Sequence, residues 1–216
     1  MKRNSANRMA CTVGAEDGKT VPFMIVKRPR IEGYAVISRE GMIATADGRF
    51  PDAIKIPADH QFYQDSVDRA AAVANGRHSA EGGEKERLRP RLVLTRRVDR
   101  LVADPHNPKV ILWNPAATPF EEAWARLSIA DGGTLAVVGG TEVFELFLTI
   151  GYDTFYLTRT EASVPEGRPV FPGVGPGVGS GATVEEIMAR HGLALRGTRL
   201  LDAALNCRVE AWMPTA

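Results

Sequence analysis

The chain has 216 residues, a length that favours one domain with additions over two complete domains. Its 27 Lys and Arg residues nearly balance its 26 Asp and Glu residues, so the net charge of +1 gives no reason to expect nucleic acid or an anionic membrane as the main partner. Hydrophobic residues make up 44% and charged residues 25%, a composition that excludes a chain that stays disordered.

Targeting signals and cysteine usage predict a cytoplasmic protein. Apolar runs such as Thr134 to Val138 stop at glycines, far short of the roughly 20 residues of a membrane helix. The basic start, Met1 to Arg8, is followed by a mixed polar segment and not by the apolar core of a secretory signal, so we expect no export. Cys11 and Cys207 lie near opposite ends without metal-ligand spacing, which predicts neither a disulfide framework nor a metal site.

Residues 1–30 have no regular hydrophobic period and are predicted to form an extension before a domain of residues 31–216. From there strands and helices alternate, as is typical of an α/β protein. A helix is predicted over 58–70, because the stretch follows Pro57, lacks Gly and Pro, and carries Asp59 in its first turn. The strands of this half are expected at 34–37, 42–44, 71–74 and 91–95.

The second half continues the alternation. Pro119 is predicted at the first position of a helix, and the Gly- and Pro-rich tract 173–181 is predicted to be a long surface loop. The remaining helices and strands are expected at 120–127, 141–148 and 183–190, and at 109–113, 134–138, 153–158 and, as two strands, within 196–212. The predicted fold is a single α/β domain whose mostly parallel central sheet ends in an antiparallel C-terminal hairpin.

Three of these strands end in small, polar or basic residues that suit an anionic ligand. The pair Gly139-Gly140 lets a backbone approach a phosphate closely, and the helix that starts at Thr141 offers N–H groups and a dipole. Polar turns also follow strands at 75–79 and 95–97. Because ligands of open α/β sheets bind beyond the carboxyl ends of the strands, these edges together predict one long anionic ligand. Taken singly, each arginine is better explained as a solvated charge. The glycine pair, which lacks the spacing of a Rossmann dinucleotide site, is by itself better explained as a tight turn.

Seven short motifs follow one another in the order found in a known superfamily. They are Met42-Ile43-Ala44, residues 56–63 (Ile-Pro-Ala-Asp-His-Gln-Phe-Tyr), Asn75-Gly76-Arg77-His78-Ser79, Leu94-Thr95-Arg96, residues 137–144 (Val-Val-Gly-Gly-Thr-Glu-Val-Phe), Tyr156-Leu157-Thr158 and Phe171-Pro172. Over about residues 34–212 the chain resembles the dihydrofolate reductase superfamily. The resemblance implies a three-layer fold and an NADPH-dependent reductase that passes a hydride to a C=N carbon of a small pterin-type heterocycle.

The resemblance also implies residue roles. Asp59 matches the buried active-site carboxylate, which would accept two hydrogen bonds from a pterin, and Thr158 matches the hydroxyl that supports it. Tyr63, one turn after Asp59, would stack on the substrate or belong to the core, and Ala44 and Arg89 are further expected substrate contacts. The residues expected to bind NADPH are Gly76, Arg77, His78, Ser79, Thr95, Arg96, Gly139, Gly140, Thr141, Glu142 and Val143.

Two features leave the substrate open. Folate reductases usually have a tryptophan after the proline of their mobile loop, whereas Asp52 follows Pro51 here and the loop to Pro57 is longer, which puts folate in doubt. Arg87 and Arg91 lie as close in sequence to the expected tail-binding position as Arg89 does.

A second relative with this fold is the reductase domain of riboflavin biosynthesis. Residues 38–48 (Ser-Arg-Glu-Gly-Met-Ile-Ala-Thr-Ala-Asp-Gly) are similar to its Ser-x-x-Gly-x-x-Ala signature. A stand-alone 5-amino-6-(5-phosphoribosylamino)uracil reductase is therefore the alternative function, and we expect no zinc deaminase because the sequence lacks its signatures. The further alternative is a non-catalytic nucleotide-binding protein, which an exposed, unpaired Asp59 would favour over an enzyme. We expect small-molecule partners, and the sequence leaves open whether the chain forms a homodimer.

Overall fold

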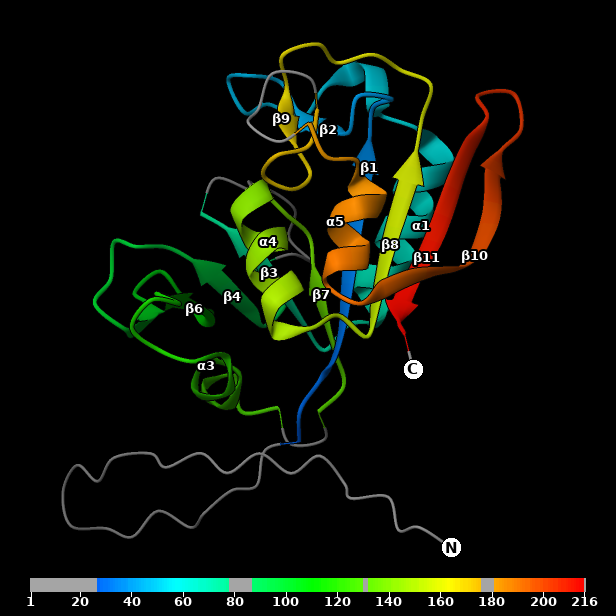
Figure 1. Ribbon diagram of the computed structural model, residues 1–216. Coiled ribbons are helices and arrows are strands. Elements are labelled where there is room, and N and C mark those ends of the chain that lie inside the picture. Colours follow the sequence, from blue (N-terminus) through cyan, green and yellow to red (C-terminus); the bar gives the residue numbers. More distant parts are fainter. Residues whose placement is uncertain (1–26, 78–86, 130–131, 176–180, 216) are drawn as a thin grey trace, which may run out of the picture.

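A sheet of nine strands forms the centre of the computed structural model, which describes residues 27–77, 87–129, 132–175 and 181–215 (Figure 1). The strand order is β10-β11-β8-β1-β7-β3-β4-β6-β5. These strands are β1 (Arg30–Ile37), β3 (Ala72–Gly76), β4 (Arg91–Leu94), β5 (Leu101–Asp104), β6 (Asn107–Trp113), β7 (Thr134–Val137), β8 (Thr154–Arg159), β10 (Leu193–Asp202) and β11 (Cys207–Pro214). A separate antiparallel pair joins β2 (Met42–Ala44) to β9 (Arg168–Pro169).

The sheet is parallel in its middle and antiparallel at both edges. From β8 to β6 each strand runs parallel to its neighbours. The β10–β11 hairpin joins this part antiparallel to β8, which confirms the predicted C-terminal hairpin. At the other edge β5 runs antiparallel to β6, an edge that the sequence did not predict. Its middle residues, Val102 and Ala103, are exposed, so β5 lacks the alternation of buried and exposed residues that indicates a strand.

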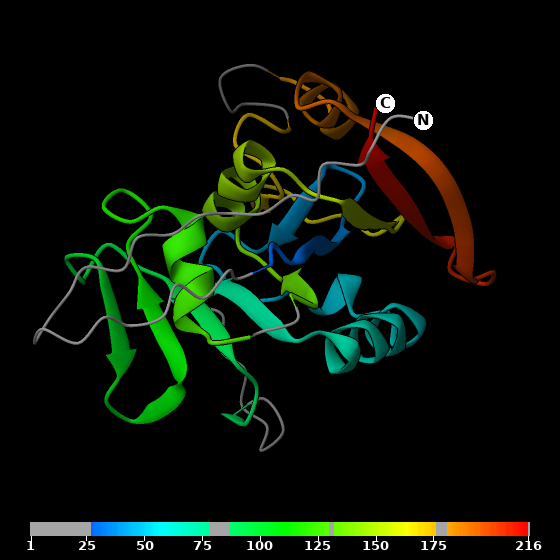
Figure 2. The ribbon, with the colours of Figure 1, turned by 90° about the horizontal axis from the view of Figure 1, so that it is seen from below.

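Helices cover both faces of the sheet and make three layers (Figures 1 and 2). Helix α1 (Pro57–Arg69) packs on one face, where its Val67 meets Tyr34, Val73 and Ala136. The other face is covered by α3 (Phe120–Arg126), α4 (Thr141–Ile150) and α5 (Val184–Arg190), whose apolar residues join the main core. The predicted single α/β architecture is therefore correct, with a short 3₁₀ helix, η1 (Asp52–Ile54), before α1.

Local differences from the predicted elements have simple causes. Pro119 is the N-cap of α3 and not its first residue, because its ψ of 158° is extended and only Phe120 turns into the helix. Asn75 and Gly76, predicted in a turn, extend β3, because they pair with Val93 and Leu94 of β4. Of the extension predicted over residues 1–30, residues 1–26 lie outside the described residues. Strand β1 begins at Arg30, the last residue of the predicted extension.

The core is dominated by aromatic rings on the face that α4 covers. Phe155 of β8 makes edge-on contacts with Tyr152 and Phe144, at 5.0 and 5.4 Å between ring centroids. Rings in this arrangement add attraction beyond the area that they bury. They fix α4 against β8 and β1, and with it the position of the loop Gly139-Gly140 that precedes α4. In the described part of the chain, no helix combines the length and the apolar character needed to cross a bilayer.

Candidate active site

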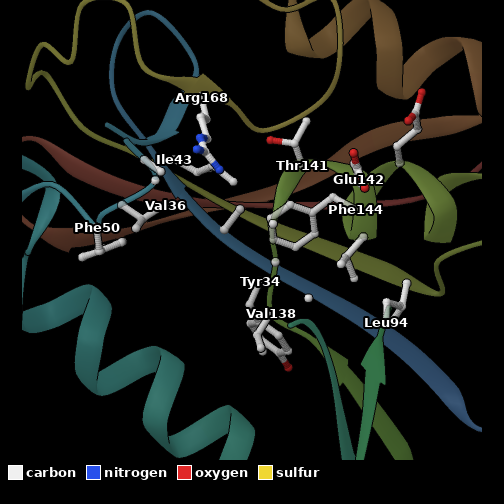
Figure 3. A pocket seen from close by; sticks show the side chains of 18 of the residues that line it. Tyr34, Val36, Ile43, Phe50, Leu94, Val138, Thr141, Glu142, Phe144 and Arg168 are labelled. Atoms are coloured by element: carbon white, nitrogen blue, oxygen red, sulfur yellow. The ribbon is translucent and has the colours of Figure 1, made fainter. Parts of the chain in front are cut away.

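A cleft of about 2090 Å³ lies at the carboxyl ends of the parallel strands (Figure 3). Its walls come from α1, from the N-terminus of α4, from the ends of β3 and β4, and from residues 48–50, which belong to what we call the 45–50 loop. Pockets for one small molecule usually measure about 300 to 1,000 Å³, so this cleft has room for a dinucleotide together with a second small ligand.

The charged side chains that line the cleft are mostly basic. The basic residues are Arg49, Lys55, Arg77, Arg89, Arg96, Arg97 and Arg168, whereas the acidic ones are Asp59, Glu142 and Glu145. The whole chain carries a net charge of only +1, so positive charge is concentrated at the cleft. Clefts of one sign of charge attract ligands of the opposite sign, and this cleft therefore favours an anionic ligand.

Asp59 lines the cleft from the first turn of α1, two residues after Pro57. Burial raises the pKa of its carboxyl, while the hydrogen-bonding hydroxyl of Thr158 and the charge of His60 act in the opposite direction. Thr158 is itself buried in β8 and also lines the cleft. Burial, together with the charge of Asp59, raises the pKa of the neighbouring Cys207 thiol to about 11. A partly buried carboxyl with a raised pKa in a cleft is a group suited to exchanging or sharing a proton with a ligand.

The three predicted substrate contacts all line the cleft. Tyr63 is half-buried and packs on the core cluster beneath α1, so it forms part of the cleft wall and part of the core. Ala44 reaches the cleft from β2. Among the three neighbouring arginines only Arg89 is a lining residue, and its Nη2 donates to Asp68 Oδ1 at 2.7 Å. Arg91 is buried within β4, and Arg87 precedes it without reaching the cleft.

The residues predicted to hold the cofactor come from three chain segments that meet at the same cleft. The lining includes Gly76, Arg77, Thr95, Arg96, Gly139, Gly140, Thr141, Glu142 and Val143. The structure thus brings together the three strand ends that the sequence singled out. His78 and Ser79, also predicted to bind the cofactor, lie outside the described residues.

Several of these side chains already have protein partners. Arg96 lies 3.3 Å from both carboxylate oxygens of Glu142, but both side chains are about 80% exposed, so this ion pair is weak. The Thr95 hydroxyl accepts the Arg97 N–H at 3.2 Å and shapes the turn after β4. The Thr141 hydroxyl donates to the Pro169 carbonyl, which ties the start of α4 to β9.

The start of α4 is open toward the cleft. Its N-cap, Gly140, has no side chain to cap the helix, and a Cβ placed there would meet no atom within 4 Å. The first N–H groups of a helix have no partner within it and carry partial positive charge. With the arginines after β3 and β4, this donor set fits the diphosphate and the ribose phosphate of NADPH.

Some lining residues had no role in the sequence interpretation. Tyr156 lies two residues before Thr158 on β8, so strand alternation places it on the same face, where it stacks on Tyr34 at 5.2 Å between centroids. Phe50, half-exposed, and Arg168 also reach the cleft, from the 45–50 loop and from β9. The alternation of side chains along a strand could have predicted Tyr156, whereas no local sequence pattern indicates Phe50 or Arg168. Within the described residues, no three His, Cys, Asp or Glu side chains gather as they would around a metal ion.

The raised pKa of Asp59 predicts that Asp59→Asn makes the protein more stable at neutral pH. Because the folded-state pKa lies above that of the unfolded chain, at about 4, ionisation favours unfolding once the pH rises above that value. The wild type should therefore lose stability relative to the variant as pH rises through the raised pKa, and the two should converge near pH 4. Chemical denaturation of both proteins over this pH range checks the prediction, which a pH-independent difference would contradict.

Comparison with solved structures finds the same fold in two proteins named as reductases and in one named for riboflavin biosynthesis. A diaminohydroxyphosphoribosylaminopyrimidine deaminase/5-amino-6-(5-phosphoribosylamino)uracil reductase from Thermotoga maritima matches with a TM-score of 0.58 and 15% identity over 87% of this chain. Dihydrofolate reductase from Enterococcus faecalis, complexed with NADP(H) and RAB-propyl, matches with a TM-score of 0.56 and 16% identity over 86% of this chain and 96% of its own.

A Shewanella sp. PV-4 protein that is named for riboflavin biosynthesis matches with a TM-score of 0.56 and 15% identity, over 87% of this chain and 99% of its own. The chain spans 57% of the length of the Thermotoga protein. No protein-family model and no curated sequence matches the chain. At these identities the structures show the fold alone, which is the dihydrofolate reductase-like α/β fold.

Proposed function

We propose that this chain, which has the dihydrofolate reductase-like fold, is an NADPH-dependent reductase that transfers a hydride to a C=N carbon of a small pterin-type heterocycle. One observation carries the proposal: a single cleft is lined both by the partly buried carboxyl of Asp59, whose pKa is raised, and by an open helix start with neighbouring arginines. The carboxyl suits a nitrogen heterocycle, and the helix start with its arginines suits a dinucleotide. The dihydrofolate reductase that shares the fold was solved with NADP(H), which supports the choice of cofactor.

In this proposal, residues at one end of the cleft bind the cofactor, and Asp59 at the other end binds the substrate and controls its protonation. When bound, NADPH supplies the hydride. Gly139, Gly140 and the first N–H groups of α4 would hold its diphosphate, and Arg77 and Arg96 its ribose phosphate. At the other end Asp59 would accept two hydrogen bonds from the amidine-like edge of the substrate.

Desolvation then shapes the chemistry at Asp59. Its partly buried carboxyl binds a proton more readily than an exposed one, and the same group, as a carboxylate, would stabilise the protonated, more electrophilic ring of the substrate. Thr158, buried beneath it, orients the carboxyl. The apolar side chains of Ile54 and Phe50 line the adjoining wall and would reduce the access of water to the reacting atoms.

A phosphorylated ribosylaminouracil is the second candidate substrate. Arg49 and Lys55 line the cleft from the segment between β2 and α1, and they would suit a phosphate on the substrate. Two of the proteins that share the fold are named for uracil reduction or riboflavin biosynthesis. The Ser-x-x-Gly-x-x-Ala match is also explained by the fold, since Ser38 accepts the Glu40 and Met42 N–H groups and Gly41 has a φ of +84°.

A non-catalytic nucleotide-binding role is the weaker alternative, because Asp59 is neither exposed nor without a hydrogen-bonding neighbour. Small molecules are the only partners that the proposal requires. The proposal also places the reaction in the cytoplasm, where a pool of NADPH is available.

The decisive test is NADPH oxidation by the purified chain, with dihydrofolate and the ribosylaminouracil phosphate as separate acceptors. We expect steady turnover with one of them and a rise in melting temperature with NADPH alone. Turnover with dihydrofolate only would select the pterin, and turnover with the uracil compound only would select the second candidate. A chain that binds NADPH and reduces neither would support the non-catalytic alternative, whereas absence of NADPH binding would refute the proposal.

A further inference from the structure

Arg168 of β9 is held so that its guanidinium faces the cleft. Its Nε–H donates to the Ala46 carbonyl at 3.1 Å, and the side chain lines the cleft near Ile43 and Thr141 (Figure 3). A Cβ on Gly48 would lie 3.0 Å from Arg168 Cζ, so the guanidinium rests directly against the backbone of the 45–50 loop. The loop thus fixes the direction of this arginine at two points.

The two terminal nitrogens of Arg168 are available to a ligand. In the part of the chain that the structure describes, Arg168 has no carboxylate partner, and its one hydrogen bond uses Nε. The other arginines whose partners were described above, Arg89 and Arg96, each contact a carboxylate. An arginine guanidinium with two free donors in one plane matches two oxygens of a phosphate group.

The position of Arg168 beside α4 indicates which ligand group it meets. The next residue, Pro169, accepts a hydrogen bond through its carbonyl from Thr141, the first residue of α4. The guanidinium therefore belongs to the same wall as the helix start that would hold the diphosphate. Asp59, the proposed substrate anchor, lies instead on α1, which covers the other face of the sheet.

We propose that Arg168 binds the diphosphate of the dinucleotide from the side of the 45–50 loop, in addition to the N–H groups of α4. This assignment rests on the proposed function. Since the same side chain holds the Ala46 carbonyl, the bound diphosphate and the 45–50 loop share one fixed side chain. The diphosphate is common to NADP⁺ and NAD⁺, so Arg168 contributes to the binding of both, unlike a residue that contacts the ribose 2′-phosphate.

Calorimetric titration of NADP⁺ and NAD⁺ into the wild type, Arg168→Ala and Arg168→Lys tests the assignment. We expect Arg168→Ala to weaken both ligands by the same factor, about tenfold or more, as for a lost hydrogen-bonded charge pair. Lysine keeps the charge but not the paired donors, so Arg168→Lys should fall in between. Arg96→Ala should weaken NADP⁺ more than NAD⁺. The matched control is Arg100→Ala, which removes an equal charge outside the cleft and should bind like the wild type.

The outcomes separate this assignment from the proposed function. If the wild type binds neither dinucleotide, both are refuted. If the wild type binds and Arg168→Ala binds equally well, only the role of Arg168 is refuted, and a raised KM for the acceptor in that variant would place Arg168 on the substrate. A loss confined to NADP⁺ would also overturn the assignment, in favour of the 2′-phosphate. If thermal unfolding shows that Arg168→Ala is not folded, the Arg168→Lys titration decides by the same criteria.

Discussion

Asp59→Asn should lower turnover by about a hundredfold or more while changing the affinity for NADPH less than twofold. The amide keeps the shape of the carboxyl but carries no negative charge, and its Nδ2 donates, so it cannot accept one hydrogen bond on each of its two terminal atoms from a protonated heterocycle. Loss of a group that acts in general acid–base catalysis typically costs 10²–10⁴-fold in rate. The proposed cofactor contacts, at the start of α4 and after β3 and β4, come from other segments of the chain.

This prediction is checked by steady-state kinetics with the acceptor that the wild type uses, together with titration of NADPH. The matched control is Asp65→Asn, because Asp65 lies on the same helix, is exposed, and is not a lining residue of the cleft. We expect this control to behave like the wild type. Equal losses of turnover and of NADPH affinity in Asp59→Asn would show that Asp59 supports the cleft as a whole and does not act on the substrate.

A variant that is inactive but more stable at neutral pH would link the two Asp59 predictions. Partial burial of a carboxyl costs folding energy, and the raised pKa of Asp59 shows that this cost exceeds what the Thr158 hydroxyl and the charge of His60 offset. Such a cost is common where function requires a group in an unfavourable environment. The joint result would separate Asp59 from an ordinary helix-start carboxylate, whose removal would lower the stability.

The main architecture could be predicted from the sequence because its signals are local. Apolar runs bounded by glycine or proline indicated the central strands, and the helices begin within a residue or two of the predicted positions. What could not be predicted depends on contacts far apart in the chain. Strand β9, only Arg168–Pro169, exists because it pairs with β2, and its pairing partners lie more than 120 residues earlier.

The candidate site divides in the same way. Asp59 and Gly139-Gly140 stand at the starts of helices, so sequence position alone predicts that they lie at the carboxyl edge of the sheet. The orientation of Arg168 depends on the Ala46 carbonyl, which is 122 residues away in the chain. The choice of Arg89 over its neighbours likewise needed the structure, because strand β4 buries Arg91 while the turn before it turns Arg89 toward the cleft.

Gly33→Ala should destabilise the protein by about 2 to 3 kcal/mol, as expected for an added methyl group in a packed core. Gly33 lies in β1 between β7 and β8. A Cβ there would lie 2.3 Å from Phe155 Cδ2 and 2.8 Å from Tyr152 Cε1. Both rings are almost completely buried and contact each other edge-on, so neither can move without disturbing the aromatic core.

Urea denaturation of Gly33→Ala beside Gly197→Ala measures this effect against a matched control. Gly197 lies on the edge strand β10, where a Cβ would meet no atom within 4 Å. Alanine there should be neutral or stabilising by up to about 1 kcal/mol, because glycine loses more conformational freedom on folding. If both variants changed the free energy of unfolding by the same amount, strand propensity and not ring packing would explain the effect of Gly33→Ala. A loss confined to Gly33→Ala would show that the contact between β1 and the Phe155 and Tyr152 rings fixes β8, the strand that carries Thr158 into the cleft.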